Sequence, residues 1–264
     1  MYYDFETLIN RSELGSSKWL GMKQKKPNVS KEIVPFSVAD MEFKNAPEII
    51  EGLKEYLDET ILGYTSPTEN YLDSVVNFMN RHHNWEIDKS WIVTAPGVVP
   101  ALAHAIRGFT NPGDGVIIMT PVYYPFFACV TMNNRVIIEN PLVDNEGHYE
   151  INFEDLELKA SNAKNKILLF CSPHNPIGRV WTKDELEKVA TICLKYDVLI
   201  ISDEIHFDLI MPGYEHTVMA TLSDEVADKC IVCTAPSKTF NLAGMQTSNL
   251  VIKNENLRER MKRA

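Results

Sequence analysis

Short apolar runs alternate with amphipathic stretches along most of the chain. Each run is rich in β-branched and other apolar residues and ends in polar or turn-forming ones, which is typical of a buried strand. Helical patterns separate most runs, as in "TKDELEKVATICLKYD", which opens with Thr182 and Glu185 in capping-box spacing. Strands alternating with helices predict a mostly parallel, doubly wound α/β sheet. The seven predicted strands are "SWIVTA", "GVIIMT", "RVIIENP", "KILLFCS", "VLIISDE", "KCIVCTA" and "SNLVIK".

Residues 1–45 precede this alternation and contain several turn formers. They predict an N-terminal arm that also forms part of a smaller domain, and residues 46–264 then form a large ligand-binding domain. The last residues, "NENLRERMKRA", have the pattern of a helix that has just begun. Because the seven predicted strands already account for the sheet of the large domain, we expect the C-terminal half of the small domain to be absent from this chain.

The composition of the chain limits the kinds of partner that it can be expected to bind. The chain has 264 residues, 45% of them hydrophobic, and a net charge of −10 from 26 basic and 36 acidic residues. Nucleic acids and anionic membranes select clustered basic residues, so neither is expected as a partner. The N-terminus lacks the pattern of a signal peptide, and no apolar run approaches the roughly 20 residues of a membrane span. We expect a soluble, cytoplasmic protein.

The five cysteines are an odd number in a chain large enough to fold without disulfides, which predicts reduced thiols. Cys230 and Cys233 form a C-x-x-C pattern inside an apolar run. Residues three apart in a strand point to opposite faces, and no second pair completes a zinc site. No metal site is predicted.

Chemically useful residues follow several of the predicted strands. Lys238 comes shortly after "KCIVCTA", and Asp203 ends the apolar run "VLIIS". Asn175 follows "KILLFCS", and Tyr123 or Tyr124 offers an aromatic ring after "GVIIMT". In open α/β sheets the carboxyl ends of the strands form the ligand-binding edge, so we expect these side chains to converge there. Taken singly, each has a structural alternative: a surface lysine, a helix cap, an Asn-Pro turn or core packing.

A phosphate-binding helix start is predicted in "PGVVPALAHAI". Gly97 permits a sharp turn, and Pro100 suits the first turn of a helix. The backbone amides of Val98 and Val99 are then free at the positive end of the helix dipole. Helices that begin with glycine and proline are also common without any ligand.

Together these residues are the parts needed to hold pyridoxal 5′-phosphate. A lysine forms a Schiff base, and an aspartate keeps the pyridine nitrogen protonated so that the ring can accept electrons. An aromatic ring stacks on the cofactor, and an amide donates to its phenolic oxygen. The chain lacks the G-x-G-x-x-G and P-loop fingerprints, so dinucleotide and P-loop nucleotide sites are not supported.

Six motifs occur in order along the chain: "VADMEF" (38–43), "GVVPA" (97–101), "PVY" (121–123), "SPHNPIGRVW" (172–181), "SDEIHFDL" (202–209) and "PSKTFNLAGM" (236–245). In these motifs the chain resembles the fold-type I pyridoxal-phosphate enzymes, which share the fold of aspartate aminotransferase, and within them the MalY/PatB group of cystathionine β-lyase-like C–S lyases. The resemblance implies a homodimer in which Lys238 is the Schiff-base lysine, Asp203 the partner of the pyridine nitrogen and Asn175 the donor to the phenolic oxygen. It implies ring stacking by Tyr123, and phosphate contacts from Val98, Val99, Ser237 and, across the subunit interface, Tyr64.

Two positions distinguish the lyase group from ordinary class I aminotransferases. The latter usually carry tyrosine three residues after the aspartate, where this chain has His206, and arginine eight residues after the lysine, where it has Gln246. Both differences favour the lyase group, although His206 is also compatible with a purely hydrogen-bonding role. Ser172 departs from the asparagine that the group usually has there.

The resemblance implies a pyridoxal-phosphate-dependent C–S β-lyase that converts cystathionine, cysteine or another S-substituted cysteine to a thiol, pyruvate and ammonia. The alternatives are an aminotransferase of class I or II and, more remotely, a regulatory protein that binds the cofactor and acts through protein partners. In the fold-type I family the C-terminal half of the small domain carries the arginine for the substrate α-carboxylate. We therefore expect a chain that ends at Ala264 to be an incomplete catalyst.

Overall fold

The computed structural model describes residues 3–30 and 32–264. The chain divides into two compact units. The first, which we call the N-terminal unit, combines Met1–Thr65 with Ser237–Met245, and the second, the sheet unit, combines Ser66–Pro236 with Gln246–Ala264. The N-terminal unit thus contains all of residues 1–45 and also a segment from far along the chain.

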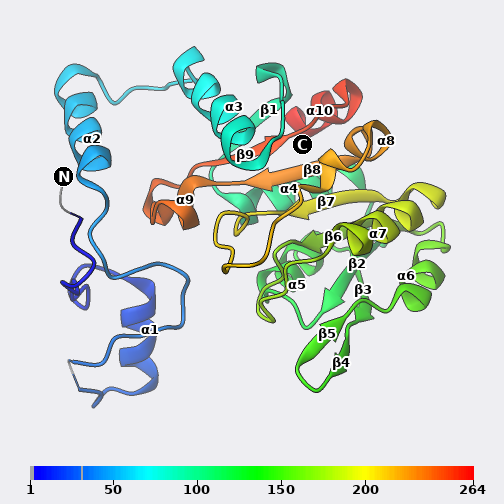
Figure 1. Ribbon diagram of the computed structural model, residues 1–264, viewed down its shortest axis with the longest axis horizontal. Helices are drawn as coiled ribbons and strands as arrows, with labels where there is room; N and C mark the ends of the chain where they lie inside the picture. The colour runs from blue at the N-terminus through cyan, green and yellow to red at the C-terminus, as the bar shows by residue number, and fades with distance from the viewer. Residues whose placement is uncertain (1–2, 31) are drawn as a thin grey trace. The chain divides into compact units, whose positions relative to one another are not determined.

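A seven-stranded sheet is the centre of the sheet unit (Figure 1). All neighbouring strands are parallel except those that flank β9, which runs antiparallel to both β1 and β8. Each strand lies within or overlaps one of the seven predicted apolar runs, so the α/β fold with a mostly parallel sheet is confirmed. In spatial order the strands are β1 (Ile92–Ala95), β9 (Ser248–Val251), β8 (Cys230–Thr234), β7 (Leu199–Asp203), β6 (Asn165–Cys171), β2 (Gly115–Thr120) and β3 (Val136–Pro141).

Helices cover both faces of this sheet and bury two apolar clusters. Successive strand residues point to opposite faces, so Leu168 joins one cluster and Ile167 the other. A sheet covered on both faces needs apolar residues at every position, which explains the continuous runs in the sequence. One face is covered by α3 (Glu69–His83), α6 (Phe153–Ala160), α7 (Lys183–Lys195) and α8 (Asp224–Asp228), and the other by α4 (Val98–Phe109), α5 (Pro125–Thr131) and α10 (Glu255–Lys262).

Smaller elements complete the sheet unit. A hairpin of β4 (Val143–Asn145) and β5 (His148–Glu150) turns at Glu146 and Gly147, which have φ angles of 53° and 91°. Glycine suits the second position because a side chain is rarely tolerated at that angle. Two short 3₁₀ helices, η1 (Lys89–Trp91) and η2 (Met219–Thr221), lie in loops.

The N-terminal unit contains α1 (Ser17–Lys25), α2 (Pro47–Glu59) and the 3₁₀ helix η3 (Ala243–Met245). The short helix α9 (Pro236–Thr239) lies at the boundary between the two units. Trp19 of α1 is buried, whereas none of the residues of α2 is. Among the residues that the structure describes, no helix is long and apolar enough to cross a membrane.

Candidate active site

Asp203 is the last residue of β7, at the carboxyl edge of the sheet, and is only 4% exposed. It lies in register with Cys171 of β6 and Cys233 of β8. The backbone amide of Ile205 donates to its Oδ1 atom over 3.2 Å. Burial raises the pKa of the nearby Cys129 thiol to about 11, and the Asp203 charge adds to that shift. A negative charge is therefore concentrated at this edge.

Tyr123 follows β2 and reaches the same edge. Its ring is half-buried and lies 5.4 Å from that of Tyr124 and 6.3 Å from that of Phe126, between centroids. Burial raises the pKa of the Tyr123 phenol, with smaller contributions from Tyr124 and Asp203. Tyr124 is 78% exposed. Of the two tyrosines that the sequence left open, Tyr123 is therefore the better stacking candidate.

Asn175 lies in the turn that follows β6. Its backbone amide donates to Sγ of Cys171 over 3.4 Å, and the amide of Ser172 donates to the carbonyl oxygen of Asp203 over 3.0 Å. Among the described residues nothing hydrogen-bonds to the half-buried side-chain amide of Asn175. The neighbouring strands β2, β6 and β7 thus bring Tyr123, Asn175 and Asp203 to one edge of the sheet.

The start of α4 follows β1 at Gly97, whose φ of 107° suits glycine. No side chain caps this helix end, so the first backbone amides point outward from the positive end of the helix dipole. Sγ of Cys129 donates to the carbonyl oxygen of Val99 over 3.6 Å. Since the charge of Asp203 acts on that same thiol, the start of α4 also lies near the carboxylate.

His206 lies in the turn after β7 and is half-buried. Its carbonyl oxygen accepts a hydrogen bond of 2.9 Å from the amide of Leu209. His206 therefore lies on the loop that leaves the sheet edge after Asp203.

Lys238 is the third residue of α9, which follows β8. Its Nζ donates to the carbonyl oxygen of Ala39 over 3.1 Å. The surrounding segment is held by the same stretch of chain, since the amide of Met41 donates to Oδ1 of Asn241 over 2.9 Å, and Nδ2 of Asn45 to the carbonyl oxygen of Phe240 over 2.9 Å. The motifs "VADMEF" and "PSKTFNLAGM" are thus packed together, which their spacing did not indicate.

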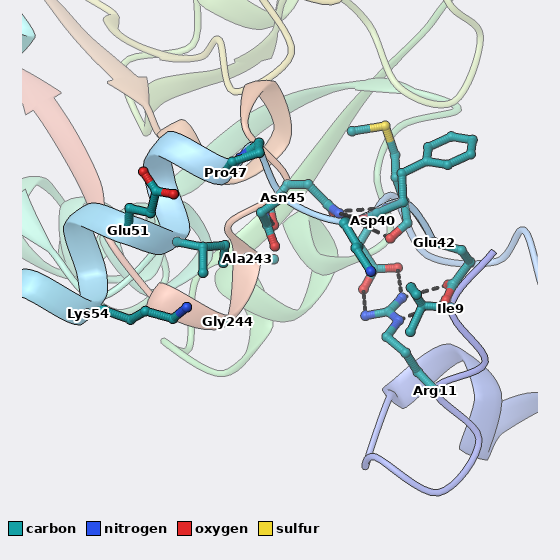
Figure 2. A pocket seen from close by; sticks show the side chains of 15 residues that line it. Ile9, Arg11, Asp40, Glu42, Asn45, Pro47, Glu51, Lys54, Ala243 and Gly244 are labelled. Carbon is teal, nitrogen blue, oxygen red and sulfur yellow. Dashed lines mark hydrogen bonds and ion pairs between the residues drawn. The ribbon is translucent and has the colours of Figure 1, made fainter. Parts of the chain in front are cut away.

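The N-terminal unit contains a pocket of about 570 Å³ beside this segment (Figure 2). At its edge Arg11 binds Glu42 through Nε to Oε2 (2.8 Å) and Nη2 to Oε1 (2.6 Å), and its Nη1 reaches Oδ2 of Asp40 over 3.0 Å. The buried Lys18 lies 2.6 Å from Oε1 of Glu42. These four residues, which we call the ionic cluster, fix the chain on either side of Met41. They were missed because no periodic pattern links Arg11 to residues 40–42.

The ionic cluster predicts acid sensitivity of the N-terminal unit. Hydrogen bonding to Arg11 lowers the pKa of Glu42 to about 2, below its ordinary value of 4.5. A lowered folded-state pKa stabilises the fold fully above the unfolded value and loses that contribution as the pH falls through the folded one. We therefore expect Glu42→Gln to lose roughly 3 kcal/mol of stability at pH 7, but little at pH 2. Thermal unfolding across this pH range tests it, with the exposed Glu13→Gln as control. Equal losses at both pH values would contradict the assignment.

All five cysteines are buried and none forms a disulfide. Cys230 and Cys233 pack into opposite apolar clusters, which confirms that the C-x-x-C pattern lies on two faces of a strand. Within the described chain, no group of three or more histidine, cysteine, aspartate and glutamate side chains is arranged to bind a metal.

The candidate residues are divided between the two units. Asp203, Asn175, Tyr123, Val98, Val99 and His206 belong to the sheet unit, and Lys238, Ser237 and Tyr64 belong to the N-terminal unit.

A sequence profile of the family "Aminotransferase class I and II" matches residues 31–264, and the chain belongs to that family. Within that family the chain is similar to PatB and MalY. It is 45% identical over 233 residues to cystathionine β-lyase PatB of Bacillus subtilis (strain 168), which covers 88% of this chain and 59% of PatB. It is 29% identical over 258 residues to the protein MalY of Escherichia coli (strain K12), which covers 97% of this chain and 65% of MalY. The chain thus spans less than two thirds of the length of these curated relatives.

Solved structures show the same relationship. Cystalysin from Treponema denticola, whose structure contains a pyridoxal 5′-phosphate cofactor, matches all of this chain and 67% of its own with a TM-score of 0.98 and 58% identity. The pyridoxal-phosphate-bound C–S lyase from Staphylococcus hominis matches 98% of this chain and 65% of its own with a TM-score of 0.89 and 31% identity. These matches confirm the expected fold-type I architecture.

Proposed function

We propose that this protein is a pyridoxal-phosphate-dependent C–S β-lyase of the cystathionine β-lyase type. Its substrates are cystathionine, cysteine or other S-substituted cysteines, and its products a thiol, pyruvate and ammonia. The observation that carries the proposal is the meeting of Asp203, Asn175 and Tyr123 at the carboxyl edge of the sheet. The likeness to cystalysin and to PatB supports the same chemistry.

The residues at this edge fit the cofactor. The buried carboxylate of Asp203 suits a cationic partner, as a protonated pyridine nitrogen is. The half-buried amide of Asn175 is an available donor for the phenolic oxygen. The uncapped start of α4 offers backbone amides to a phosphate. The half-buried ring of Tyr123 offers a stacking surface.

When bound, pyridoxal phosphate supplies a covalent link to an amine and a sink for the electron pair left at the substrate Cα. We assign to Lys238 the covalent link to the resting cofactor. Once the substrate amine has replaced it in that link, the freed Lys238 amine would remove the α-proton and carry it. Asp203 holds the proton on the pyridine nitrogen, which keeps the sink effective. Loss of the thiolate from Cβ and addition of water would then account for the products, a thiol, pyruvate and ammonia. His206 lies beside this edge, and we assign it to the site without a proton-transfer role.

We further propose a cytoplasmic homodimer in which Ser237 of one subunit and Tyr64 of the other contact the phosphate. Tyr64 is fully exposed within its own chain, and Phe36, Ile61 and Leu62 are each largely exposed. Large exposed apolar side chains gathered in one unit support burial against a second copy. The five buried, free cysteines support a reducing compartment.

The proposed reaction predicts thiol and pyruvate in equal amounts from cystathionine or an S-alkyl cysteine. Elimination needs only a leaving group at Cβ, so no amino acceptor is required. A thiol reagent and a lactate dehydrogenase assay measure the two products. Alanine, which lacks the leaving group, is the matched control and should yield neither. Stoichiometric pyridoxamine phosphate, with keto acid formed only when an acceptor is supplied, would identify an aminotransferase instead.

A further inference from the structure

Glu204 follows Asp203 directly and has no exposed surface. Its Oε1 atom accepts hydrogen bonds from Oγ of Ser202 over 2.8 Å and from the backbone amide of Met219 over 3.0 Å. Its Oε2 atom lies 2.8 Å from Nε2 of His216, whose side chain is 3% exposed. Ser202, His216 and Met219 all belong to the sheet unit, as Glu204 does.

These contacts lie on the opposite face of β7 from the Asp203 carboxylate. Strand side chains alternate, so Ser202 points to one face of β7 and Asp203 to the other. Glu204 follows the strand, and its carboxylate lies on the Ser202 side because it accepts a hydrogen bond from Oγ of Ser202. The hydrogen bond between Ser202 and Glu204 therefore spans the backbone of Asp203 from behind. The backbone is also held laterally, because the amide of Glu204 donates to the carbonyl oxygen of Cys233 over 2.9 Å.

The same carboxylate closes the loop that leaves the sheet edge. Residues 205–218 run out from β7 and return through His216 to η2, and both His216 and Met219 contact Glu204. A second pair holds the loop from outside, where Nε2 of His83 lies 2.8 Å from Oδ1 of Asp208, and its ring stacks on Phe207 at 3.9 Å between centroids. The start and the end of this loop are therefore both held by the buried carboxylate of Glu204, the residue that follows Asp203.

We propose that Glu204, held by His216, is a positioning residue that fixes the direction of the Asp203 carboxylate toward the ligand-binding edge. This inference takes the role of Asp203 in cofactor binding from the proposed function. The part that concerns how Glu204 holds the chain at Asp203 does not depend on that function. Burial of a carboxylate carries a desolvation cost that its hydrogen-bond partners must offset, whereas an apolar residue would fill the same space without that cost. What the carboxylate provides instead is a set of directional hydrogen bonds, with Ser202, His216 and Met219, next to Asp203.

The test compares Glu204→Ala with Glu204→Gln. The glutamine retains an acceptor for Ser202 and Met219 and can donate to a neutral His216 imidazole, whereas the alanine removes all three contacts. Asn165→Ala is the matched control, since Asn165 is also buried and polar, and its Nδ2 donates to the carbonyl oxygen of Lys159 over 2.7 Å at the amino end of β6.

Two readouts separate positioning from simple destabilisation. In the cofactor-free protein, hydrogen exchange of the Ile205 amide, which donates to Asp203, should be at least about tenfold faster in Glu204→Ala and nearly unchanged in Glu204→Gln and Asn165→Ala. The dissociation constant for pyridoxal phosphate, from absorbance titration, should rise about tenfold or more in Glu204→Ala alone. An Ile205 exchange rate that follows only the loss in melting temperature, equally in Asn165→Ala, would overturn the inference. Failure of the unmodified protein to bind pyridoxal phosphate would instead refute the proposed function, and the exchange measurement would still decide the role of Glu204.

Discussion

Replacement of Lys238 by alanine should abolish covalent attachment of pyridoxal phosphate and lower the lyase rate by about 10³-fold or more. The amine is assigned both the covalent bond and the α-proton, so its loss removes two functions at once. The fold should tolerate the change, because the side chain is only half-buried and its Nζ donates to a neutral carbonyl oxygen, that of Ala39. Borohydride reduction followed by peptide mapping measures the attachment.

Lys229→Ala is the control for this experiment. Lys229 directly precedes β8, at the end opposite to Lys238, and pairs with Asp197 on the surface. It should keep both the label and the activity. A reduced label on a peptide that lacks Lys238 in the unmodified protein would refute the whole assignment of the site.

Replacement of Asp203 by asparagine should lower the rate by about 10² to 10³-fold and leave the covalent label in place. The two side chains have the same shape, so Ile205 keeps its hydrogen-bond acceptor, and what disappears is the charge that keeps the pyridine nitrogen protonated. In the cofactor-free protein the same change should lower the pKa of Tyr123, because burial and the charge of Asp203 both raise it. Steady-state kinetics and ultraviolet titration of the phenol measure the two effects.

Asp197→Asn is the matched control, since this exposed carboxylate lies just before β7 at the opposite end of the strand. Its activity should be unchanged. An Asp203→Asn enzyme with full activity would mean that another group protonates the cofactor.

The sequence predicted the strands well because a sheet covered on both faces requires unbroken apolar runs, and these stand out from amphipathic helices. It did not indicate the β4–β5 hairpin, whose strands are short and mostly exposed. The residues at the carboxyl edge were found because one topological rule places them there. The antiparallel direction of β9 was missed, because an apolar run predicts that a strand is present but not the direction in which it runs.

Two sets of contacts, those of the ionic cluster and those of Glu204, could not be predicted from the sequence. The ionic cluster joins Arg11 and Lys18 to residues 40–42 through irregular chain, where no period exists to align them. Glu204 was quoted within the motif "SDEIHFDL" but not singled out, since its partner His216 is fixed by a loop whose path the sequence does not give. Long-range contacts of individual polar side chains depend on tertiary geometry, and spacing along the chain does not encode it.

The antiparallel pairing of β8 with β9 also bears on how such a protein can evolve. Thr234 pairs with Asn249, so the segment that carries Lys238 begins and ends at neighbouring residues of the sheet. Loop closure is already achieved by that pairing, and even a doubling of loop length costs only about 0.6 kcal/mol. Insertions between these strands would therefore leave the core intact. The hydrogen bonds of Asn241 and Asn45 connect this segment to residues 39–45, so these contacts, and not the sheet, would limit where an insertion can be placed.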